Sequence, residues 1–391
     1  MKWTNCGHEF DMYKDIFTQG KKILIYGAGT LGTELLKKVS FVDCVEAFID
    51  NSTEKQSKNF CGLPVYASFD TKIDFDKYIV VVAVEKDRKL LMQQMRTLGF
   101  KDGISLFEYS SFVDFYLTLY MWFSWGKVYF YSVCINVTTK CNFNCHGCLA
   151  LVPKNKFACH YDSKMFMSSL DSFFQHVDYV DIFQMSGGET FLYPDHKILV
   201  DYIGENYRHK INYLYTTTNG SIAASKELMD SLKKNRFTVI VDDYTDSVQE
   251  YADKFERNLS LLVSNGVSVM RNKVDKWIDI LPDNCDNSHF TEDELVHYYG
   301  ACSLPWIDLL RNRLYSCTFA SYAIRASLVE ETPNDYIDLT EDLDPMKLIE
   351  FRLGYTKKGY LDFCKLCQGY IAINKFSITP AVQIKKSKNK E

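Results

Sequence analysis

The sequence predicts an α/β protein in three parts, and three observations support this fold class. Residues 128–283 alternate between short apolar runs, typical of buried strands, and longer runs whose apolar residues have helical spacing. Residues 22–38 have the pattern of a strand, a glycine-rich turn and a helix. Beyond residue 300, four cysteines accompany a predicted hairpin and a Cys-x-x-Cys pair. We therefore expect two α/β domains followed by a small cysteine-rich domain.

The first part begins with a predicted buried strand, Lys22–Tyr26, that leads directly into a glycine-rich turn. Gly27, Gly29 and Gly32 have the G-x-G-x-x-G spacing, and helical periodicity follows them. Glycines at this spacing let a phosphate group approach the N-terminus of the helix closely. The pattern therefore predicts a Rossmann-like domain whose turn binds a nucleotide.

The next predicted strand, Val45–Ile49, ends at Asp50, which is placed to hydrogen-bond a ribose hydroxyl group. Further strands are predicted at 78–84 and 103–107, so the domain amounts to about one mononucleotide-binding half. Two alternatives stay open for it. It could bind NAD for redox chemistry, or it could be a scaffold that keeps its glycines for packing and binds nothing.

Residues 111–127 are predicted to form a connector helix with a strongly aromatic face. Its apolar positions recur every three or four residues, at Phe112, Phe115, Tyr116, Leu119, Tyr120 and Phe123. Binding to a membrane surface would call for basic residues on the opposite face, and these are scarce. We expect a helix that packs between domains.

The second part, residues 128–283, is predicted to form right-handed parallel β-α units. In such folds the chemistry lies at the carboxyl ends of the strands. The strands are predicted at 133–138, 182–185, 211–216, 237–241 and 267–270, and the helices at 163–177, 195–207, 225–235 and 247–264.

Three cysteines lie in the loop that follows the first of these strands. Cys141, Cys145 and Cys148 have the spacing C-x3-C-x2-C, so one loop brings three thiols together. A [4Fe–4S] cluster offers four irons, and three local ligands leave one iron free for an exogenous ligand. A zinc loop is the chemical alternative. We predict that these cysteines hold a catalytic metal centre.

Glycine and polar residues end the strands that follow. These residues are Gly187, Gly188 and Glu189, then Thr217 and Asn219, then Arg271. Paired glycines let the backbone approach a ligand closely. Because the carboxyl ends of parallel strands meet at one edge, we expect these residues to surround the cysteine loop.

These motifs, in this order, resemble the radical S-adenosylmethionine (radical SAM) family. The resemblance implies a partial (β/α)6 barrel in which the open iron of a [4Fe–4S] cluster chelates the amino and carboxylate groups of SAM. It implies that Glu189 receives the SAM amino group and that Arg271 meets the SAM carboxylate, with a surface arginine as the alternative. The other implied cofactor contacts are Gly187, Gly188, Thr217 and Asn219. One departure is Gly147, which stands where the family usually has an aromatic residue near the adenine.

The third part holds a second set of candidate ligands: Cys302, Cys317, Cys364 and Cys367. The first two flank a hairpin predicted from Trp306–Leu310 and Arg313–Ser316. Four thiols suit a fully ligated cluster or a tetrahedral zinc. The order resembles the twitch domain of radical SAM enzymes, which implies one auxiliary [4Fe–4S] cluster, although Asn312 stands where that domain usually has glycine. The longer SPASM domain would need seven cysteines here, and only five occur from residue 285 onward.

The composition indicates which partners and which cellular compartment to expect. A formal net charge of −5 and a pI of about 6.0 offer no basic field to nucleic acid. No run of 18 apolar residues predicts a membrane span, and the N-terminus lacks a signal-peptide pattern. Thirteen cysteines in such a chain favour metal or redox use in a reducing compartment, so we expect a cytoplasmic protein.

We expect a radical SAM enzyme of the oxidoreductase or epimerase type. The resemblance implies cleavage of SAM to methionine and a 5′-deoxyadenosyl radical, with a flavodoxin- or ferredoxin-like electron donor. The Rossmann-like part resembles domains fused to enzymes of bacterial surface-glycan synthesis, so the expected substrate is a carbohydrate or sugar nucleotide. Two alternatives stay open: a maturase of ribosomally made peptides and a non-catalytic iron–sulfur sensing module.

The predicted domain boundaries follow from these motifs. They are 1–110 for the Rossmann-like domain, 111–127 for the connector, 128–283 for the radical SAM barrel, and 284–391 for the twitch-type domain with its tail.

Overall fold

The computed structural model describes residues 1–56, 58–67, 77–302 and 306–384, so the end of the predicted tail lies outside the described residues. The chain folds into two compact units. The smaller unit comprises Gly7–Tyr131 and Val177–Asp181, and the larger comprises Met1–Cys6, Ser132–His176 and Ile182–Glu391. The predicted connector thus belongs to the smaller unit, while the predicted barrel and cysteine-rich parts share the larger one.

A five-stranded sheet with the order β3-β2-β1-β4-β5 forms the smaller unit, and its strand pairings are parallel. Strands β1 and β4 are buried almost throughout, which explains their continuous apolar sequence. Strand β3, only two residues long, carries no periodicity and was missed. The elements are η1 (Asp11–Tyr13), β1 (Lys22–Tyr26), α1 (Thr30–Lys38), β2 (Val45–Ile49), α2 (Thr53–Gln56), β3 (Val65–Tyr66), β4 (Tyr78–Val82), α3 (Arg88–Thr97) and β5 (Leu106–Glu108).

The predicted connector forms one helical stretch whose aromatic face packs inside the smaller unit. It consists of α4 (Tyr109–Ser111), η2 (Phe112–Tyr116) and α5 (Leu117–Trp125). The ring of Tyr120 meets that of Phe17 at 5.7 Å, and the ring of Tyr116 meets that of Phe107 at 4.8 Å. We expected this face to pack between domains. Instead it forms part of the core of the smaller unit.

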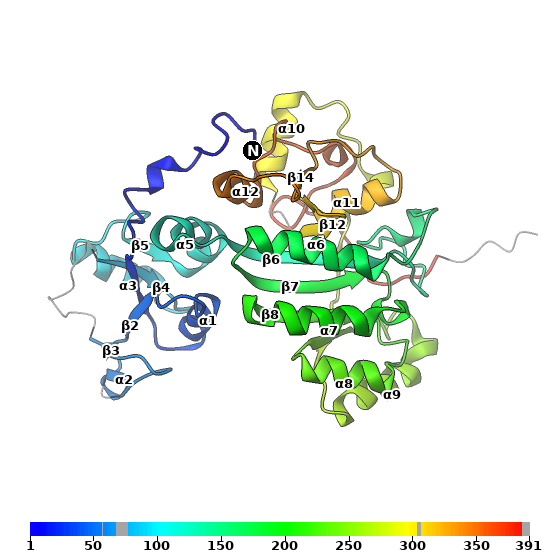
Figure 1. Ribbon diagram of the computed structural model, residues 1–391, viewed down its shortest axis with the longest axis horizontal. Coiled ribbons are helices and arrows are strands. Elements are labelled where there is room, and N and C mark those ends of the chain that lie inside the picture. Colours follow the sequence, from blue (N-terminus) through cyan, green and yellow to red (C-terminus); the bar gives the residue numbers. More distant parts are fainter. Residues whose placement is uncertain (57, 68–76, 303–305, 385–391) are drawn as a thin grey trace, which may run out of the picture. The chain divides into compact units, whose positions relative to one another are not determined.

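An eight-stranded sheet with the order β10-β9-β8-β7-β6-β12-β13-β14 organises the larger unit. Each strand and helix predicted between residues 128 and 283 is found. Helices α6, α7 and α8 lie side by side along the sheet, in the order of the strands they follow (Figure 1). The elements are β6 (Tyr129–Thr138), η3 (Val152–Lys154), α6 (Ser163–His176), β7 (Tyr179–Gly187), η4 (Thr190–Leu192), α7 (His196–Asn206), η5 (Arg208–Lys210), β8 (Ile211–Thr218), α8 (Lys226–Lys234), β9 (Thr238–Asp242), η6 (Gln249–Tyr251), α9 (Ala252–Ser264) and β10 (Ser268–Asn272).

The cysteine-rich part continues this sheet instead of forming a sheet of its own. The predicted hairpin is present as β12 and β13, and Arg311 and Asn312 both adopt positive φ, as a two-residue type I′ turn requires. Strand β12 pairs in parallel with β6, and β14 extends the sheet beyond β13. The remaining elements are β11 (Trp277–Ile278), η7 (Pro282–Asn284), α10 (Glu292–Ala301), β12 (Ile307–Leu310), β13 (Arg313–Tyr315), α11 (Thr318–Arg325), β14 (Tyr336–Asp338), α12 (Pro345–Arg352), η8 (Asp362–Leu366) and β15 (Ser377–Ile378).

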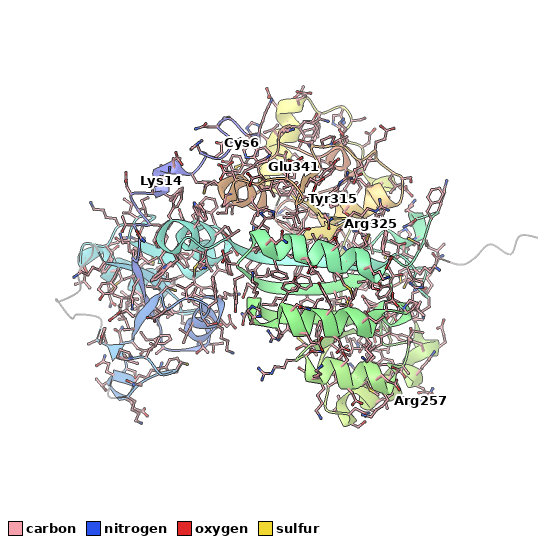
Figure 2. The ribbon with its side chains drawn as sticks, in the orientation of Figure 1. Cys6, Lys14, Arg257, Tyr315, Arg325 and Glu341 are labelled. Atoms are coloured by element: carbon pink, nitrogen blue, oxygen red, sulfur yellow. The ribbon has the colours of Figure 1, made fainter. Side chains whose placement is uncertain are left out.

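A buried polar network ties β12 to β6. The carboxylate of Asp308 on β12 is fully buried, accepts a hydrogen bond from Asn136 Nδ2 at 2.9 Å and pairs with the guanidinium of Arg325. Arg325 lies on α11, where Figure 2 labels it. A buried carboxylate needs such partners, because its desolvation is otherwise uncompensated. The network holds in place the strand that leads into the cysteine loop.

Within the described residues, no helix has both the length and the apolar character needed to cross a membrane.

Candidate active site at the strand ends

A cavity of about 250 Å³ opens at the carboxyl ends of β6 to β9. The three cysteines of the predicted metal centre line it, and so do four of the predicted cofactor contacts. These lining residues are Cys141, Cys145, Cys148, Gly187, Gly188, Thr217 and Asn219. The motifs at the ends of β6, β7 and β8 therefore lie together around one cavity, as expected.

Burial shapes the chemistry of the cysteine loop. It raises the pKa of Cys141 and of Cys145 to about 12 each, and it also raises the pKa of Cys148. The metal-free thiols are therefore protonated at neutral pH, and binding of iron must displace their protons. Among the described residues, no three His, Cys, Asp or Glu side chains are placed to hold a single metal ion. The thiols surround a cavity, as ligands of a cluster of several irons do.

The paired glycines serve a close approach between two strand ends. A Cβ atom at Gly187, where φ is +141°, would lie 2.3 Å from the carbonyl oxygen of Thr138. A Cβ atom at Gly188 would lie 2.1 Å from the carbonyl oxygen of Lys140. The backbone N–H groups of Gly188 and Glu189 donate to these same oxygens at 2.8 and 2.9 Å. The glycines therefore allow the end of β7 to hydrogen-bond to the start of the cysteine loop. From the sequence, we expected them to let the backbone approach a ligand.

Glu189 does not line the cavity. Its buried carboxylate accepts hydrogen bonds from Asn219 N and Thr218 Oγ1, both at 2.7 Å, and from Phe191 N at 2.9 Å. Burial raises its pKa to about 7, against the opposing effect of these bonds. We expected this side chain to receive the SAM amino group. In the structure it ties the end of β7 to the end of β8, and its contact with SAM stays a prediction.

Arg271 also departs from its expected role. Its guanidinium donates to Asp243 at 2.7 Å, pairs with Glu256 at 2.9 Å and lies 5.0 Å over the ring of Phe255. The residue does not line the cavity. Strand β10 is the edge strand of the sheet, so its side chains are more exposed than those of the inner strands. The alternative of a surface arginine fits the structure better than a contact with the SAM carboxylate.

Several cavity residues escaped the sequence analysis. Asp242, the last residue of β9, lines the cavity and is half-buried. It receives a hydrogen bond from Asn272 Nδ2 at 2.6 Å, and desolvation raises its pKa to about 6. Its place at the end of a predicted strand was a signal that could have found it. The other missed lining residues include Tyr244, Trp277, Trp306, Phe319 and Tyr370. Most come from loops and short elements without periodicity.

The four predicted ligands of the second centre line a smaller cavity of about 30 Å³. These are Cys302, Cys317, Cys364 and Cys367. Backbone N–H groups already point at two of the sulfurs: Tyr370 N lies 3.3 Å from Cys302 Sγ, and Gly369 N lies 3.4 Å from Cys367 Sγ. Such N–H···S bonds are a common feature of iron–sulfur sites. The four thiols thus share one buried pocket.

The predicted nucleotide-binding turn lies in the smaller unit, and its three glycines differ in how closely other atoms pack against them. A Cβ atom at Gly27 would lie 2.6 Å from Ala83 O, and one at Gly32 would lie 2.1 Å from Gly27 O, so both positions are required by packing. At Gly29, by contrast, a Cβ atom would meet nothing within 4 Å. Of the three, Gly29 alone borders space that a ligand could fill.

Asp50 binds groups of the turn itself, and its contact with a ribose stays a prediction. Its carboxylate accepts the N–H groups of Ala28 at 3.0 Å and of Ser52 at 2.9 Å, and it pairs with Lys55 at 2.9 Å. The side chain therefore stabilises the conformation of the glycine-rich turn. The position of Asp50 at the end of a strand could be predicted from the sequence, but its hydrogen-bond donors could not.

Comparison with known proteins now assigns the segment that builds the larger cavity. Residues 135–274 match the Radical SAM superfamily. The match supports a radical SAM domain in this segment. The match runs from within β6 to just beyond β10 and includes the cysteine loop. It leaves outside residues 7–131 of the smaller unit and the second cysteine set. Among curated protein sequences, none is significantly similar to this chain.

Solved structures give partial similarities to the chain. Streptococcus suis SuiB bound to precursor peptide SuiA has 15% identity over 49% of this chain and 39% of its own, with a TM-score of 0.30. Native anSMEcpe with bound AdoMet has 13% identity over 61% and 88%, with a TM-score of 0.42. BtrN in complex with AdoMet and 2-DOIA has 14% identity over 64% and 98%, with a TM-score of 0.37. This chain thus spans about two fifths of SuiB.

The radical SAM family implies a [4Fe–4S] cluster and S-adenosylmethionine as cofactors, and the cavity suits them. Three thiols on one loop could each ligate an iron, which would leave one iron open to an exogenous ligand. The polar groups of Thr217 and Asn219 and the backbone at Gly187 line the cavity. Cys141, Cys145 and Cys148 would hold the cluster, and SAM would lie against the ends of β7 and β8.

Proposed function

We propose that this protein is a radical SAM enzyme that abstracts a hydrogen atom from a carbohydrate or sugar nucleotide, leading to dehydrogenation or epimerisation in glycan synthesis. When bound, the first cluster and SAM supply the 5′-deoxyadenosyl radical that removes the hydrogen atom, and a second [4Fe–4S] cluster supplies an acceptor for the electron that a dehydrogenation releases. The remaining steps belong to the side chains of the cavity.

One observation carries the proposal: the two cysteine-lined cavities share a wall. Phe319 and Tyr370 line both cavities, and their rings lie 5.5 Å apart. The backbone N–H of Tyr370 also donates to the sulfur of Cys302. A substrate held in the larger cavity would therefore lie about one aromatic side chain from the second set of thiols. This arrangement favours dehydrogenation over epimerisation, because only the former needs an electron acceptor beside the substrate.

The lining of the larger cavity supports a sugar-like substrate. Trp277, Trp306 and Tyr370 offer aromatic rings on which the C–H face of a sugar ring can stack. Asp242 offers a carboxylate that can accept a hydrogen bond from a hydroxyl group. During a dehydrogenation Asp242 would accept the hydroxyl proton, since its pKa of about 6 leaves it mostly ionised at neutral pH.

The smaller unit provides a separate argument for a nucleotide-linked substrate. Gly29 precedes α1 as its N-cap residue and borders open space, so a phosphate group can approach the helix N-terminus there. We propose that this turn binds a nucleotide or nucleotide sugar. We further propose a flavodoxin- or ferredoxin-like electron donor and a cytoplasmic location, since iron–sulfur ligands need a reducing compartment.

An anaerobic assay of the reconstituted protein tests the proposal. The protein is incubated with SAM and a reductant, together with a panel of nucleotide sugars, free sugars or short peptides. We expect nucleotide sugars or sugars to stimulate the release of 5′-deoxyadenosine. With a substrate deuterated on its ring carbons, the label should appear in the released 5′-deoxyadenosine.

Two results would contradict the proposal. Stimulation by peptides alone would favour the peptide maturase, and no stimulation by any compound, with both clusters loaded, would favour a sensing module. Asp242→Asn and Thr238→Ser serve as a matched pair, because Thr238 lies at the start of the same strand, away from the cavity. The first variant should lose turnover and the second should keep it.

A further inference from the structure

The C-terminal segment 377–384, here called the strap, lies along the cysteine loop. It begins as β15, which pairs with β11, and Ser247 Oγ donates to the carbonyl oxygen of Pro380 at 2.6 Å. Ile378 fills the space beside Gly147: a Cβ atom at this glycine, where φ is +72°, would lie 1.8 Å from Ile378 Cδ1. The strap thus occupies the position from which the usual aromatic residue is missing.

Backbone hydrogen bonds hold the strap against the loop. The N–H of His146 donates to Val382 O at 2.6 Å, and the N–H of Ile384 donates to Asn144 O at 2.8 Å. Between these two bonds, Gln383 faces Cys145 as the two residues of an antiparallel bridge. The pairing therefore places Gln383 next to Cys145, one of the three expected ligands of the cluster.

The side-chain amide of Gln383 has an orientation fixed by its neighbours. Its Oε1 accepts the N–H of Asn144 at 2.8 Å, and its Nε2 donates to the carbonyl oxygen of Ala381 at 2.7 Å. Turning the amide over would set its NH₂ group against an N–H and its oxygen against a carbonyl oxygen. In the orientation that remains, Nε2 also donates to the Sγ atom of Cys145 at 3.1 Å.

We propose that Gln383 is a positioning residue that sets the reduction potential of the cluster by donating a hydrogen bond to Cys145 Sγ. The inference rests on the proposed function, because it requires a cluster at the cysteine loop. A hydrogen bond to a thiolate ligand disperses negative charge, and a reduced cluster carries one more negative charge than the oxidised one. Gln383 therefore stabilises the reduced state more and makes the cluster easier to reduce.

A redox titration of the anaerobically reconstituted full-length protein, followed by electron paramagnetic resonance, tests this role. The relevant cluster is the one whose spectrum changes when SAM is added, which separates it from a second cluster. Gln383→Leu removes the donor, so the midpoint potential should become more negative. At the wild-type midpoint, the reduced fraction should fall several-fold. Gln383→Glu sets an oxygen against the sulfur and should lower the potential at least as far.

A control separates the hydrogen bond from the general shielding that the strap gives. Val382→Ala trims a side chain that is 44% exposed and keeps the backbone bond to His146, so the potential should stay at the wild-type value. Hydrogen exchange at the N–H groups of His146 and Ile384 reports whether the strap stays in place. Shifted potentials in the Gln383 variants with protected amides would support the proposal.

Three outcomes would overturn the inference. The first is an unchanged potential in both Gln383 variants. The second is an equal shift in Val382→Ala, and the third is a shift that follows loss of amide protection, since either would indicate solvent access as the cause. A wild-type protein without any SAM-responsive cluster would contradict the proposed function itself, so the two failures can be told apart.

Discussion

The carboxylate of Glu189 accepts the backbone N–H of Asn219 at 2.7 Å. This bond joins the end of β7 to the end of β8, and Asn219 in turn lines the cavity and lies 3.9 Å from Cys141 Sγ through its Nδ2. A residue that does not touch the cavity therefore holds in place one that does.

Replacing Glu189 with glutamine should weaken both the fold and the SAM site. Glutamine offers one acceptor oxygen to the three donors that now share two, and its NH₂ group would oppose an N–H. An unsatisfied buried donor costs about 1–3 kcal/mol of folding free energy. We expect a lower melting temperature together with about tenfold weaker SAM binding, measured by thermal denaturation and by titration of the reconstituted protein.

Thr218→Val is the control for Glu189→Gln, because it removes one bond to the carboxylate and keeps the link to Asn219. Its effect on SAM binding should be smaller. Weakened SAM binding in Glu189→Gln with an unchanged melting temperature would instead indicate direct contact with SAM.

Asp242 should give the reaction an acidic limb in its pH profile. Its pKa is raised to about 6, so the carboxyl group is protonated below this pH and can no longer accept a proton. Substrate-stimulated turnover should therefore rise with pH up to about 6 and level off above it. Asp242→Asn should be slow at every pH. A wild-type profile that is flat between pH 5 and 7 would rule out this carboxylate as the proton acceptor.

Metal analysis should find about eight irons per chain after anaerobic reconstitution, since two four-iron clusters are proposed. Replacing Cys141, Cys145 and Cys148 together by alanine should leave about half of the iron and abolish the spectral response to SAM. Replacing Cys364 and Cys367 should leave about half of the iron and keep that response. One zinc in place of the second set of irons would contradict the auxiliary cluster and leave the first one intact.

Two glycines of the nucleotide-binding turn should respond oppositely to substitution. Gly29→Ala places its Cβ atom in open space, so the melting temperature should hold while nucleotide binding weakens. Gly32→Ala places its Cβ atom 2.1 Å from a carbonyl oxygen, so the smaller unit should be destabilised. Calorimetric titration of the full-length chain with nucleotide sugars, NAD and free nucleotides measures the first effect. Unchanged binding in Gly29→Ala would make the turn a scaffold.

The sequence allowed the strand ends to be located because parallel, doubly buried strands have continuous apolar runs. Strand β6 carries such a run, and the cysteines follow at its carboxyl end. Parallel topology then brings the ends of β6, β7 and β8 to one edge, which is why the lining of the cavity was largely predictable.

The direction of side chains at those ends was not predictable. Glu189 and Arg271 both stand where the motifs place them, yet each turns to partners supplied by other segments. Three donors from η4 and from the end of β8 bind the carboxylate of Glu189, and Asp243 binds the guanidinium of Arg271. Contacts of this kind depend on neighbours that no local pattern reveals. The same holds for Gln383, which has no periodic context and meets Cys145 across 238 residues.

The parallel pairing of β12 with β6 has a consequence for how the protein is assembled. On a ribosome, the strand that precedes the cysteine loop emerges long before its neighbour, Ile307–Leu310, so that edge of the sheet stays unpaired until residue 310 has been made. The last partner of the loop, Gln383, follows later still. Loading of iron at these cysteines is therefore expected after synthesis is complete, and cells that hold the nascent chain in a reducing, chaperoned state should yield the most metallated protein.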